Sequence, residues 1–182
     1  MRPDWYVANL HKWYYVPRGC GFLWAAPGRQ ETLAPLVLSW DIDQGFPASF
    51  DWTGTRDPTP WLSIPAAFAF MDRYGEAEVR AHNHRLVRAG AALLASAWGV
   101  DITTPEHMTG SMVLVPLPHD LPHPLDEAGR LQLEQDLALK HNVVAAVTCT
   151  TASRHYLRVA ANIYNDLGDF NRLTQAVDTL RT

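Results

Sequence analysis

The sequence of 182 residues is poor in cysteine and has no long hydrophobic run. Its two cysteines, Cys20 and Cys149, form neither a CxxC pair nor a disulfide framework, which is typical of the reducing cytoplasm. The longest apolar stretch, residues 89–100, is much shorter than the about 20 residues of a membrane-spanning helix. We therefore expect a soluble, cytoplasmic protein without a membrane partner.

Basic residues are also scarce. The chain has 15 Lys and Arg against 19 Asp and Glu, a formal net charge of −4, whereas nucleic-acid binders usually carry a basic stripe. No nucleic-acid partner is therefore expected. Only Lys12 and Lys140 are lysines, so any chemistry that needs a lysine amine has two candidates. Hydrophobic residues make up 47% of the chain and charged residues 19%, which excludes a disordered protein.

Strand-like and helix-like patterns alternate along the chain, which predicts an α/β fold. Apolar runs bounded by turn residues predict strands over residues 4–7, 21–25, 36–40, 111–117, 143–149 and 155–159. Apolar residues at helical spacing predict helices within residues 61–99, over 125–140 and around 170–180. A long loop rich in Asp, Gly, Pro and Thr is expected over residues 41–60, and loops of this length are often functional.

The segment from Asn9 to Trp13, which includes His11 and Lys12, follows the first predicted strand. In a structural interpretation it is a strand end with a surface lysine. In a functional interpretation Lys12 forms a Schiff base with an aldehyde cofactor, and its polar neighbours hold a phosphate. Burial and cationic neighbours would promote the loss of the lysine proton that this chemistry requires.

Two further sites allow two interpretations each. Residues 53–57, with Thr55, are either a turn that binds its own backbone or a loop whose amides and hydroxyls bind a phosphate. Arg158 lies inside an apolar strand and therefore requires a carboxylate partner. That partner is either an internal carboxylate or the carboxylate of a substrate bound by two parallel hydrogen bonds, and the spacing leaves both open.

Other polar residues favour structural roles. His82 and His84 are two positions apart on a predicted helix, a spacing unsuited to chelation, so they indicate a polar helix face and no metal site. His119 and His123 lie among prolines and are expected to be exposed to solvent. Cys149 is expected to be a small core residue and not a nucleophile.

Three segments together resemble a known family. In order they are DWYVANLHKWYYVPRGCGFLWA, FDWTGTRDPTPWLSIPAAFAF and RHYLRVAANIYNDLGDFNRL. They resemble the class V aminotransferase group of pyridoxal-phosphate enzymes, and within it the isopenicillin N epimerase-like branch. The resemblance implies fold type I and a homodimer with active sites at its interface. It implies that residues 1–60 belong to the large cofactor-binding domain, 61–99 are connecting helices and 100–182 are the small C-terminal α/β domain.

The resemblance also implies a role for each candidate site residue. Lys12 is the Schiff-base lysine, and Asn9 and His11 lie on the phosphate side of pyridoxal 5'-phosphate. Thr55 reaches the phosphate of the cofactor in the neighbouring subunit, and Arg158 binds the carboxylate of an amino-acid substrate. The cofactor would make the substrate α-proton acidic, and the released Lys12 amine would move that proton.

Members of this group are longer than this chain, and the N-terminal half of the family pattern has no counterpart here. That half supplies the aspartate that pairs with the pyridine nitrogen, a residue that stacks on the ring, and a helix N-terminus at the phosphate. We therefore expect the C-terminal portion of an epimerase, aminotransferase or lyase, with a missing N-terminal half as a partner. The alternative is a non-catalytic fragment, or one half of a split enzyme, without a cofactor of its own.

Overall fold

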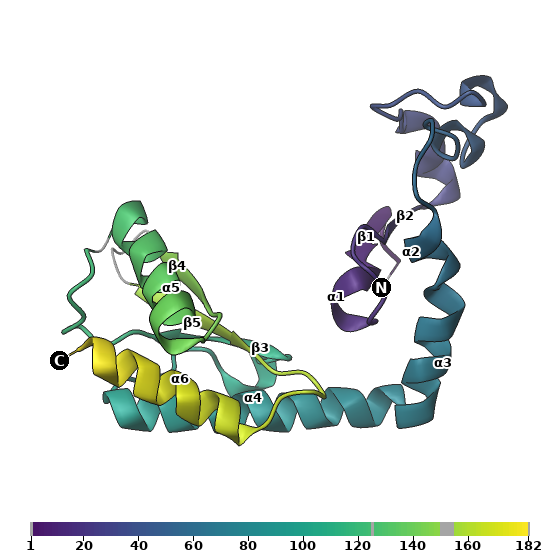
Figure 1. The fold of residues 1–182 in the computed structure, drawn as a ribbon. Helices are drawn as coiled ribbons and strands as arrows, with labels where there is room; N and C mark the ends of the chain where they lie inside the picture. Colours follow the sequence, from purple (N-terminus) through teal and green to yellow (C-terminus); the bar gives the residue numbers. More distant parts are fainter. Residues whose placement is uncertain (1, 125, 150–154, 182) are drawn as a thin grey trace. The chain divides into compact units, whose positions relative to one another are not determined.

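The computed structural model describes residues 2–124, 126–149 and 155–181, and the chain divides into two compact units (Figure 1). The N-terminal unit is Met1–Tyr74 and the C-terminal unit is Gly75–Thr182. Each unit combines helices with a small antiparallel sheet, which confirms the predicted α/β class. Among the described helices, none is both long enough and apolar enough to cross a membrane.

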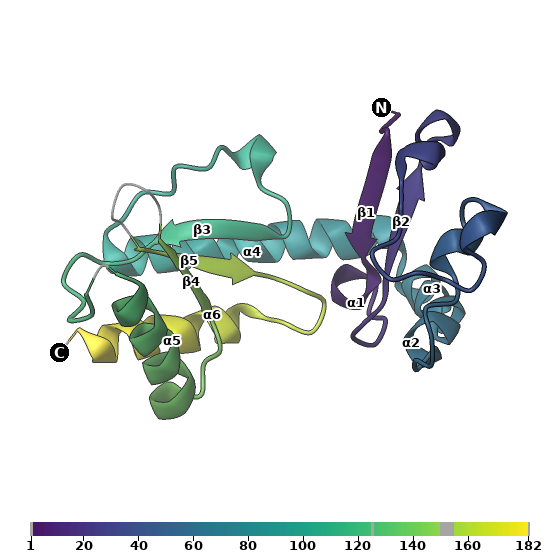
Figure 2. The ribbon, with the colours of Figure 1, turned by 90° about the horizontal axis from the view of Figure 1, so that it is seen from above.

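The N-terminal unit begins with two strands that pair along their whole length, β1 (Trp5–Asn9) and β2 (Gly21–Ala25). Their register runs from Trp5↔Ala25 to Asn9↔Gly21, and Figure 2 shows the strands side by side. The strands expected over residues 4–7 and 21–25 are thus confirmed. The remaining elements of this unit are α1 (Leu10–Trp13), η1 (Pro27–Thr32), η2 (Ile42–Gln44), η3 (Ala48–Phe50), α2 (Thr59–Leu62) and α3 (Ile64–Tyr74).

The strand predicted over residues 36–40 is wrong, because these residues form a bend and a turn. The Ser39 hydroxyl donates to the carbonyl of Ala48, and the Trp40 amide donates to the carbonyl of Trp52 at 3.2 Å. The backbone here therefore bonds to the following loop, and among the described residues no strand pairs with it. Leu36 is fully exposed, so the apolar run marks an exposed surface and not a buried strand.

The C-terminal unit is built on the sheet order β3-β5-β4, with both strand pairs antiparallel. Its strands confirm the three predicted there, and no end differs by more than three residues. The elements in chain order are α4 (Glu76–Trp98), η4 (Glu106–Met108), β3 (Met112–Pro116), α5 (Glu127–His141), β4 (Ala146–Cys149), β5 (His155–Ala160) and α6 (Leu167–Leu180). The predicted helices are confirmed as well, and Gly99 ends α4 in a left-handed conformation with φ of 63°.

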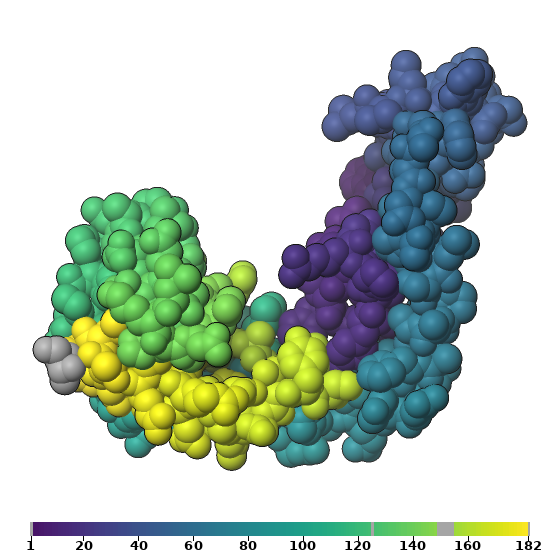
Figure 3. All heavy atoms as spheres, viewed as in Figure 1, coloured from purple at the N-terminus to yellow at the C-terminus, as the bar shows by residue number. Residues whose placement is uncertain are grey.

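One core joins this sheet to α4, α5 and α6. Along β5 the side chains alternate, so that Leu157 and Val159 are buried while Arg158 is exposed. At Gly90 of α4, the ring of Phe170 of α6 occupies the space that a side chain would fill. Figure 3 shows the outer sides of α5, in green, and α6, in yellow, on the surface of this unit.

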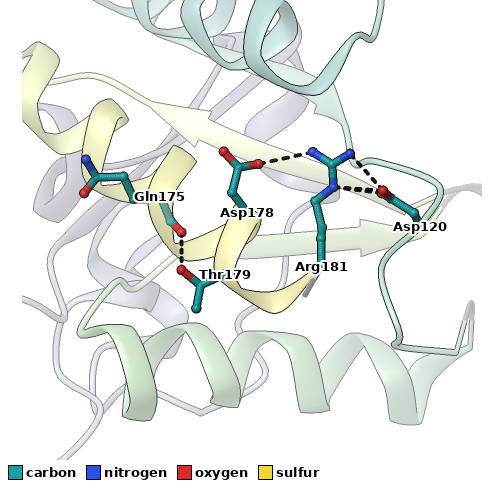
Figure 4. A network of polar contacts seen from close by, with 5 residues as sticks. All are labelled: Asp120, Gln175, Asp178, Thr179 and Arg181. Atoms are coloured by element: carbon teal, nitrogen blue, oxygen red, sulfur yellow. Dashed lines mark hydrogen bonds and ion pairs between the residues drawn. The ribbon is translucent and has the colours of Figure 1, made fainter.

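An ion-pair network fixes the C-terminal end of α6 (Figure 4). The guanidinium of Arg181 donates to both carboxylate oxygens of Asp120 at 2.8–3.1 Å, and to Asp178 at 3.2 Å. One turn back, the Thr179 hydroxyl donates to the carbonyl of Gln175 at 2.8 Å. Since Asp120 follows β3, the network ties the last helix to the sheet.

Candidate functional site

The turn that carries Lys12 is bound to the start of β2. His11 Nδ1 lies 2.9 Å from the carbonyl oxygen of Cys20, and the Leu10 amide donates to the same oxygen at 3.1 Å. The Val16 amide in turn donates to the carbonyl of Leu10 at 3.4 Å. These bonds fix the short helix α1 directly after β1. Lys12 thus lies at a strand end, as the structural interpretation also required.

The Lys12 amine is open to solvent in this unit. Its side chain is exposed, and in the described part of the chain no carboxylate pairs with it. The burial that would help it to lose its proton is therefore not supplied by the N-terminal unit itself. The arrangement leaves the amine accessible to an aldehyde from outside.

A shallow pocket of about 380 Å³ adjoins this turn on the β1–β2 sheet. Its lining residues are Val7, Ala8, Asn9, Gly21, Phe22 and Leu23. Of these described residues only Asn9 has a polar side chain, and Asn9 is the residue directly before α1. The pocket and Lys12 therefore belong to the same strand-to-helix junction.

In the loop around Thr55, the neighbouring Arg56 and Asp57 make hydrogen bonds within the loop, whereas Thr55 is exposed. Arg56 donates to the carbonyl of Asp51 at 2.9 Å and lies over the ring of Trp61, with 4.9 Å to its centroid. The hydroxyl and amide of Thr59 donate to Asp57 and hold the pKa of this carboxyl below its usual value. Thr55 is exposed, and within the described ranges no bond to its hydroxyl is recorded. Arg56 and Asp57 thus fit the turn interpretation, whereas Thr55 remains open to a ligand.

Arg158 lies on the middle strand of the C-terminal sheet, between Leu114 of β3 and Ala146 of β4. It is exposed, and no carboxylate of the described residues lies within ion-pair distance of its guanidinium. A groove of about 1020 Å³ extends from it. Glu134 and Asp169 also line this groove, but the carboxylate of Glu134 is paired with Arg130 at 2.9 Å and that of Asp169 with Arg172. The guanidinium of Arg158 is therefore free to bind a carboxylate that comes from outside the unit.

A polar cluster around the buried Asp136 in the C-terminal unit was not predicted from the sequence. Asp136 Oδ2 lies 3.1 Å from His123 Nε2, and Asp136 Oδ1 lies 3.0 Å from the ammonium of Lys140. Hydrogen bonds from Lys140 first, then from His123 and Gln132, lower the pKa of Asp136 to about 2. The expectation that His123 is exposed is wrong, since its side chain is 8% exposed, whereas His119 is exposed as expected. The i,i+4 spacing of Asp136 and Lys140 was the one signal for this cluster.

Among the described residues, the remaining histidines and cysteines form no metal site. His82 and His84 are half-buried on α4, and within residues 2–124, 126–149 and 155–181 no group of three His, Cys, Asp or Glu could hold a metal ion. Burial raises the pKa of the Cys20 thiol, which makes it unreactive. Cys149 ends β4, but its side chain lies outside the described part of the structure, so its core role stays a prediction.

Comparisons with known proteins show similarity over nearly the whole chain. Isopenicillin N epimerase from Streptomyces clavuligerus is 33% identical over 195 residues, which cover 97% of this chain and 47% of that protein. Putative L-cysteine desulfhydrase 1 from Oryza sativa subsp. japonica is 31% identical over 196 residues, which cover 97% of this chain and 40% of that protein. The chain is homologous to class V aminotransferase-like proteins. No protein-family model matches it.

A solved structure supports the same relationship at the level of the fold. The cysteine desulfurase CsdA from Escherichia coli aligns with a TM-score of 0.64 at 19% identity, over 97% of this chain and 46% of that chain. The chain therefore has the α/β fold of part of a cysteine desulfurase. It spans less than half the length of each of these three proteins.

The candidate site residues fall into two groups. Asn9, His11 and Lys12 come together at the β1–α1 junction, and Thr55 lies on a loop of the same unit. Arg158 belongs to the C-terminal unit. Their roles stay predictions.

Proposed function

We propose that this chain carries the lysine and the carboxylate-binding arginine of a pyridoxal-phosphate enzyme that transforms an amino acid. The reaction would be an epimerisation, a transamination or a lyase step. The observation that carries the proposal is homology over 97% of the chain to proteins named isopenicillin N epimerase and L-cysteine desulfhydrase. Both names refer to reactions of amino-acid compounds, so an amino acid is the expected substrate class.

The residues at the β1–α1 junction fit a phosphorylated aldehyde. The Lys12 amine is exposed and can bind the aldehyde carbon. His11 uses Nδ1 for the carbonyl of Cys20, which leaves Nε2 for a ligand, and the Asn9 amide makes no capping hydrogen bond to α1. When bound, pyridoxal phosphate withdraws electrons from the substrate Cα and makes its proton acidic. The Nζ atom of Lys12 would take that proton and return it.

Arg158 would orient the substrate. A guanidinium binds a carboxylate by two parallel hydrogen bonds, which fix the position and the rotation of the bound group. The exposed position of Arg158 between apolar cross-strand neighbours, with no described carboxylate within ion-pair distance, supports this role. An amino acid held in this way by its carboxylate would also have its Cα held in a fixed orientation by the protein.

The β1–β2 sheet supports a proposal about partners. Its large apolar side chains are exposed on both faces, with 54% of Tyr6, 68% of Val7 and 44% of Trp24 accessible. Strands with continuous apolar sequences usually lie inside a sheet that is covered on both faces, and two strands alone are marginally stable. We expect a polypeptide equivalent to the rest of the relatives' length to cover this sheet. In the complete enzyme a homodimer would bring Thr55 to the cofactor of the second subunit.

The same exposed sheet favours a second candidate, a chain that holds no cofactor by itself. Titration of the purified chain with pyridoxal 5'-phosphate, followed by visible absorption, separates the two. The first proposal predicts a new absorption band for the wild type and for Lys140→Ala, and no band for Lys12→Ala. Lys140 is the matched control because it is the other lysine and is held by Asp136 at the end of α5. A wild type without a band would favour the second candidate.

A further inference from the structure

The groove beside Arg158 has a floor of small and apolar side chains. On the sheet, Ala146 of β4 lies opposite Arg158, and Met112 of β3 lies opposite Ala160 of β5. Side chains two positions apart on a strand share a face with their cross-strand partners, so these four residues lie on one face of the sheet. All of them line the groove, and Met112 is 46% exposed. Next to Arg158 the sheet therefore offers an accessible apolar surface.

The wall of the groove is largely apolar as well. Val143 and Val144 lie in the segment before β4, and Phe170 and Leu173 lie on α6. Val144 is 94% exposed. The groove volume of about 1020 Å³ is at the upper end of the range for small-molecule sites, about 300–1,000 Å³. A ligand with only one or two carbon atoms beyond its carboxylate would leave most of this volume unfilled.

The carboxylates that line the groove are occupied by donors of the protein. Glu134 accepts a hydrogen bond from the backbone amide of Val147 at 2.8 Å and pairs with Arg130 at 2.9 Å. Asp169 pairs with Arg172, which also lines the groove. Within the described lining, Arg158 is thus the one cation without an ion-pair partner.

The pair on α6 is held by further bonds. Asp169 accepts hydrogen bonds from the side-chain amide of Asn165 at 3.0 Å and from the backbone amide of Asp166 at 3.2 Å. Asn165 first, then Asp166 and Arg172, lower the pKa of Asp169, so this carboxylate is charged at neutral pH. It therefore keeps Arg172 neutralised, and an acidic group that enters the groove finds no second free cation there.

We propose that this groove binds an amino acid with an extended, uncharged side chain, which lies over Ala160 toward Met112 while Arg158 holds the carboxylate. This inference rests on the proposed role of Arg158. Two residues of a strand span about 7 Å, which is the length of about six carbon atoms in a chain. A second carboxylate at the far end of the ligand would be desolvated without a partner, which is unfavourable.

The methyl group of Met112 provides a local probe of the groove in the full chain. Nuclear magnetic resonance of isotope-labelled methionine methyl groups is recorded during titration with acetate, hexanoate and adipate. Hexanoate and adipate have the same length and differ in the second carboxylate. Met112→Leu assigns the signal, and the exposed Met108, which does not line the groove, reports non-specific binding.

The three acids should bind with different affinities. Half of the Met112 shift should need at least about tenfold less hexanoate than acetate, because the additional methylene groups leave water. Adipate should bind at least about tenfold more weakly than hexanoate, because its second carboxylate is unpaired. Arg158→Met should abolish the shift by hexanoate, and Met108 should not shift in any of these proteins.

Asp169→Asn should produce a gain that a structural defect does not imitate. It leaves Arg172 unpaired in the groove, so adipate should gain about tenfold in affinity relative to hexanoate. Retained hexanoate binding shows that the variant is folded. Glu76→Gln is the matched control, because Glu76 pairs with Arg80 within α4 and does not line the groove, and it should bind all three acids like the wild type.

The outcomes separate this inference from the proposed function. Equal affinities of the wild type for acetate and hexanoate, or for hexanoate and adipate, would overturn the inference and leave the carboxylate role of Arg158 standing. A folded Asp169→Asn protein that does not favour adipate would also overturn it. If no acid shifts Met112 in the wild type, both the inference and the role of Arg158 are wrong, whereas the role of Lys12 is decided by the titration with pyridoxal 5'-phosphate.

Discussion

Replacing Gly90 with alanine should destabilise the C-terminal unit, although alanine is the better helix former. A Cβ atom at this position would lie 2.3, 2.4 and 2.5 Å from three ring atoms of Phe170. Ordinary contact between carbon atoms requires about 3.5–4.0 Å. Phe170 is 4% exposed, so its ring is enclosed by the core that α4 and α6 share. Either the two helices separate or the ring leaves its position.

The expected change in the free energy of unfolding is the difference between a gain in helix propensity and a cost in core packing. Alanine gains about 1 kcal/mol over glycine in a helix interior. Overpacking a core costs about 1–3 kcal/mol, and losing a phenylalanine from a core costs about 3–5 kcal/mol. Since the overlap exceeds 1 Å, the cost should be about 3 kcal/mol, where these two ranges meet. We expect Gly90→Ala to lower the free energy of unfolding by about 1–3 kcal/mol.

Urea unfolding followed by circular dichroism measures this change. Gly110→Ala is the control, because a Cβ there meets nothing within 4 Å, and it should stay within about 0.5 kcal/mol of the wild type. Combining Gly90→Ala with Phe170→Leu should cost less than the sum of the single changes, because the smaller side chain relieves the overlap. A Gly90→Ala protein as stable as the wild type would refute the close approach of α4 and α6.

The remaining predictions concern three side chains. Asp136→Asn should lose about 1–2 kcal/mol at neutral pH, because Lys140 holds the pKa of Asp136 at about 2. This stabilisation is complete above the ordinary pKa and disappears as the pH falls from about 4 to 2, so thermal melts of both proteins should converge in acid. Arg158→Met should stay within about 0.5 kcal/mol of the wild type in urea unfolding, and a larger loss would indicate a structural ion pair. Val7→Lys, on the exposed β1–β2 sheet, should reduce self-association in light scattering, and unchanged association would exclude this face as the contact.

The strands and helices of the C-terminal unit could be predicted because one face of each is buried. The alternation of Leu157, Arg158 and Val159 shows directly in the sequence which residues face the core. The run at 36–40 has similar composition, but its residues bond to the following loop and stay exposed. Composition alone does not reveal whether an apolar run finds a neighbouring strand.

In the candidate site too, features set by consecutive residues could be predicted, whereas contacts between residues distant in the sequence could not. The junction at Lys12 could be predicted because strand, turn and lysine are consecutive in the sequence. The cross-strand pairing of Asn9 with Gly21 could not, because it depends on the register of two strands. The burial of His123 against Asp136 joins residues 13 positions apart across a loop and a helix, so no local pattern indicates it. Such contacts appear only once the chain is folded.

The measurement that tests the central proposal most directly is covalent trapping of the cofactor. Borohydride reduction of the chain with pyridoxal 5'-phosphate, followed by peptide mass mapping, reports which of the two lysines is bound. The account predicts that Lys12 is labelled at cofactor concentrations where Lys140, paired with Asp136, is not. Equal labelling of Lys12 and Lys140, rising together with concentration, would contradict the account, because it would show that the β1–α1 junction has no cofactor site.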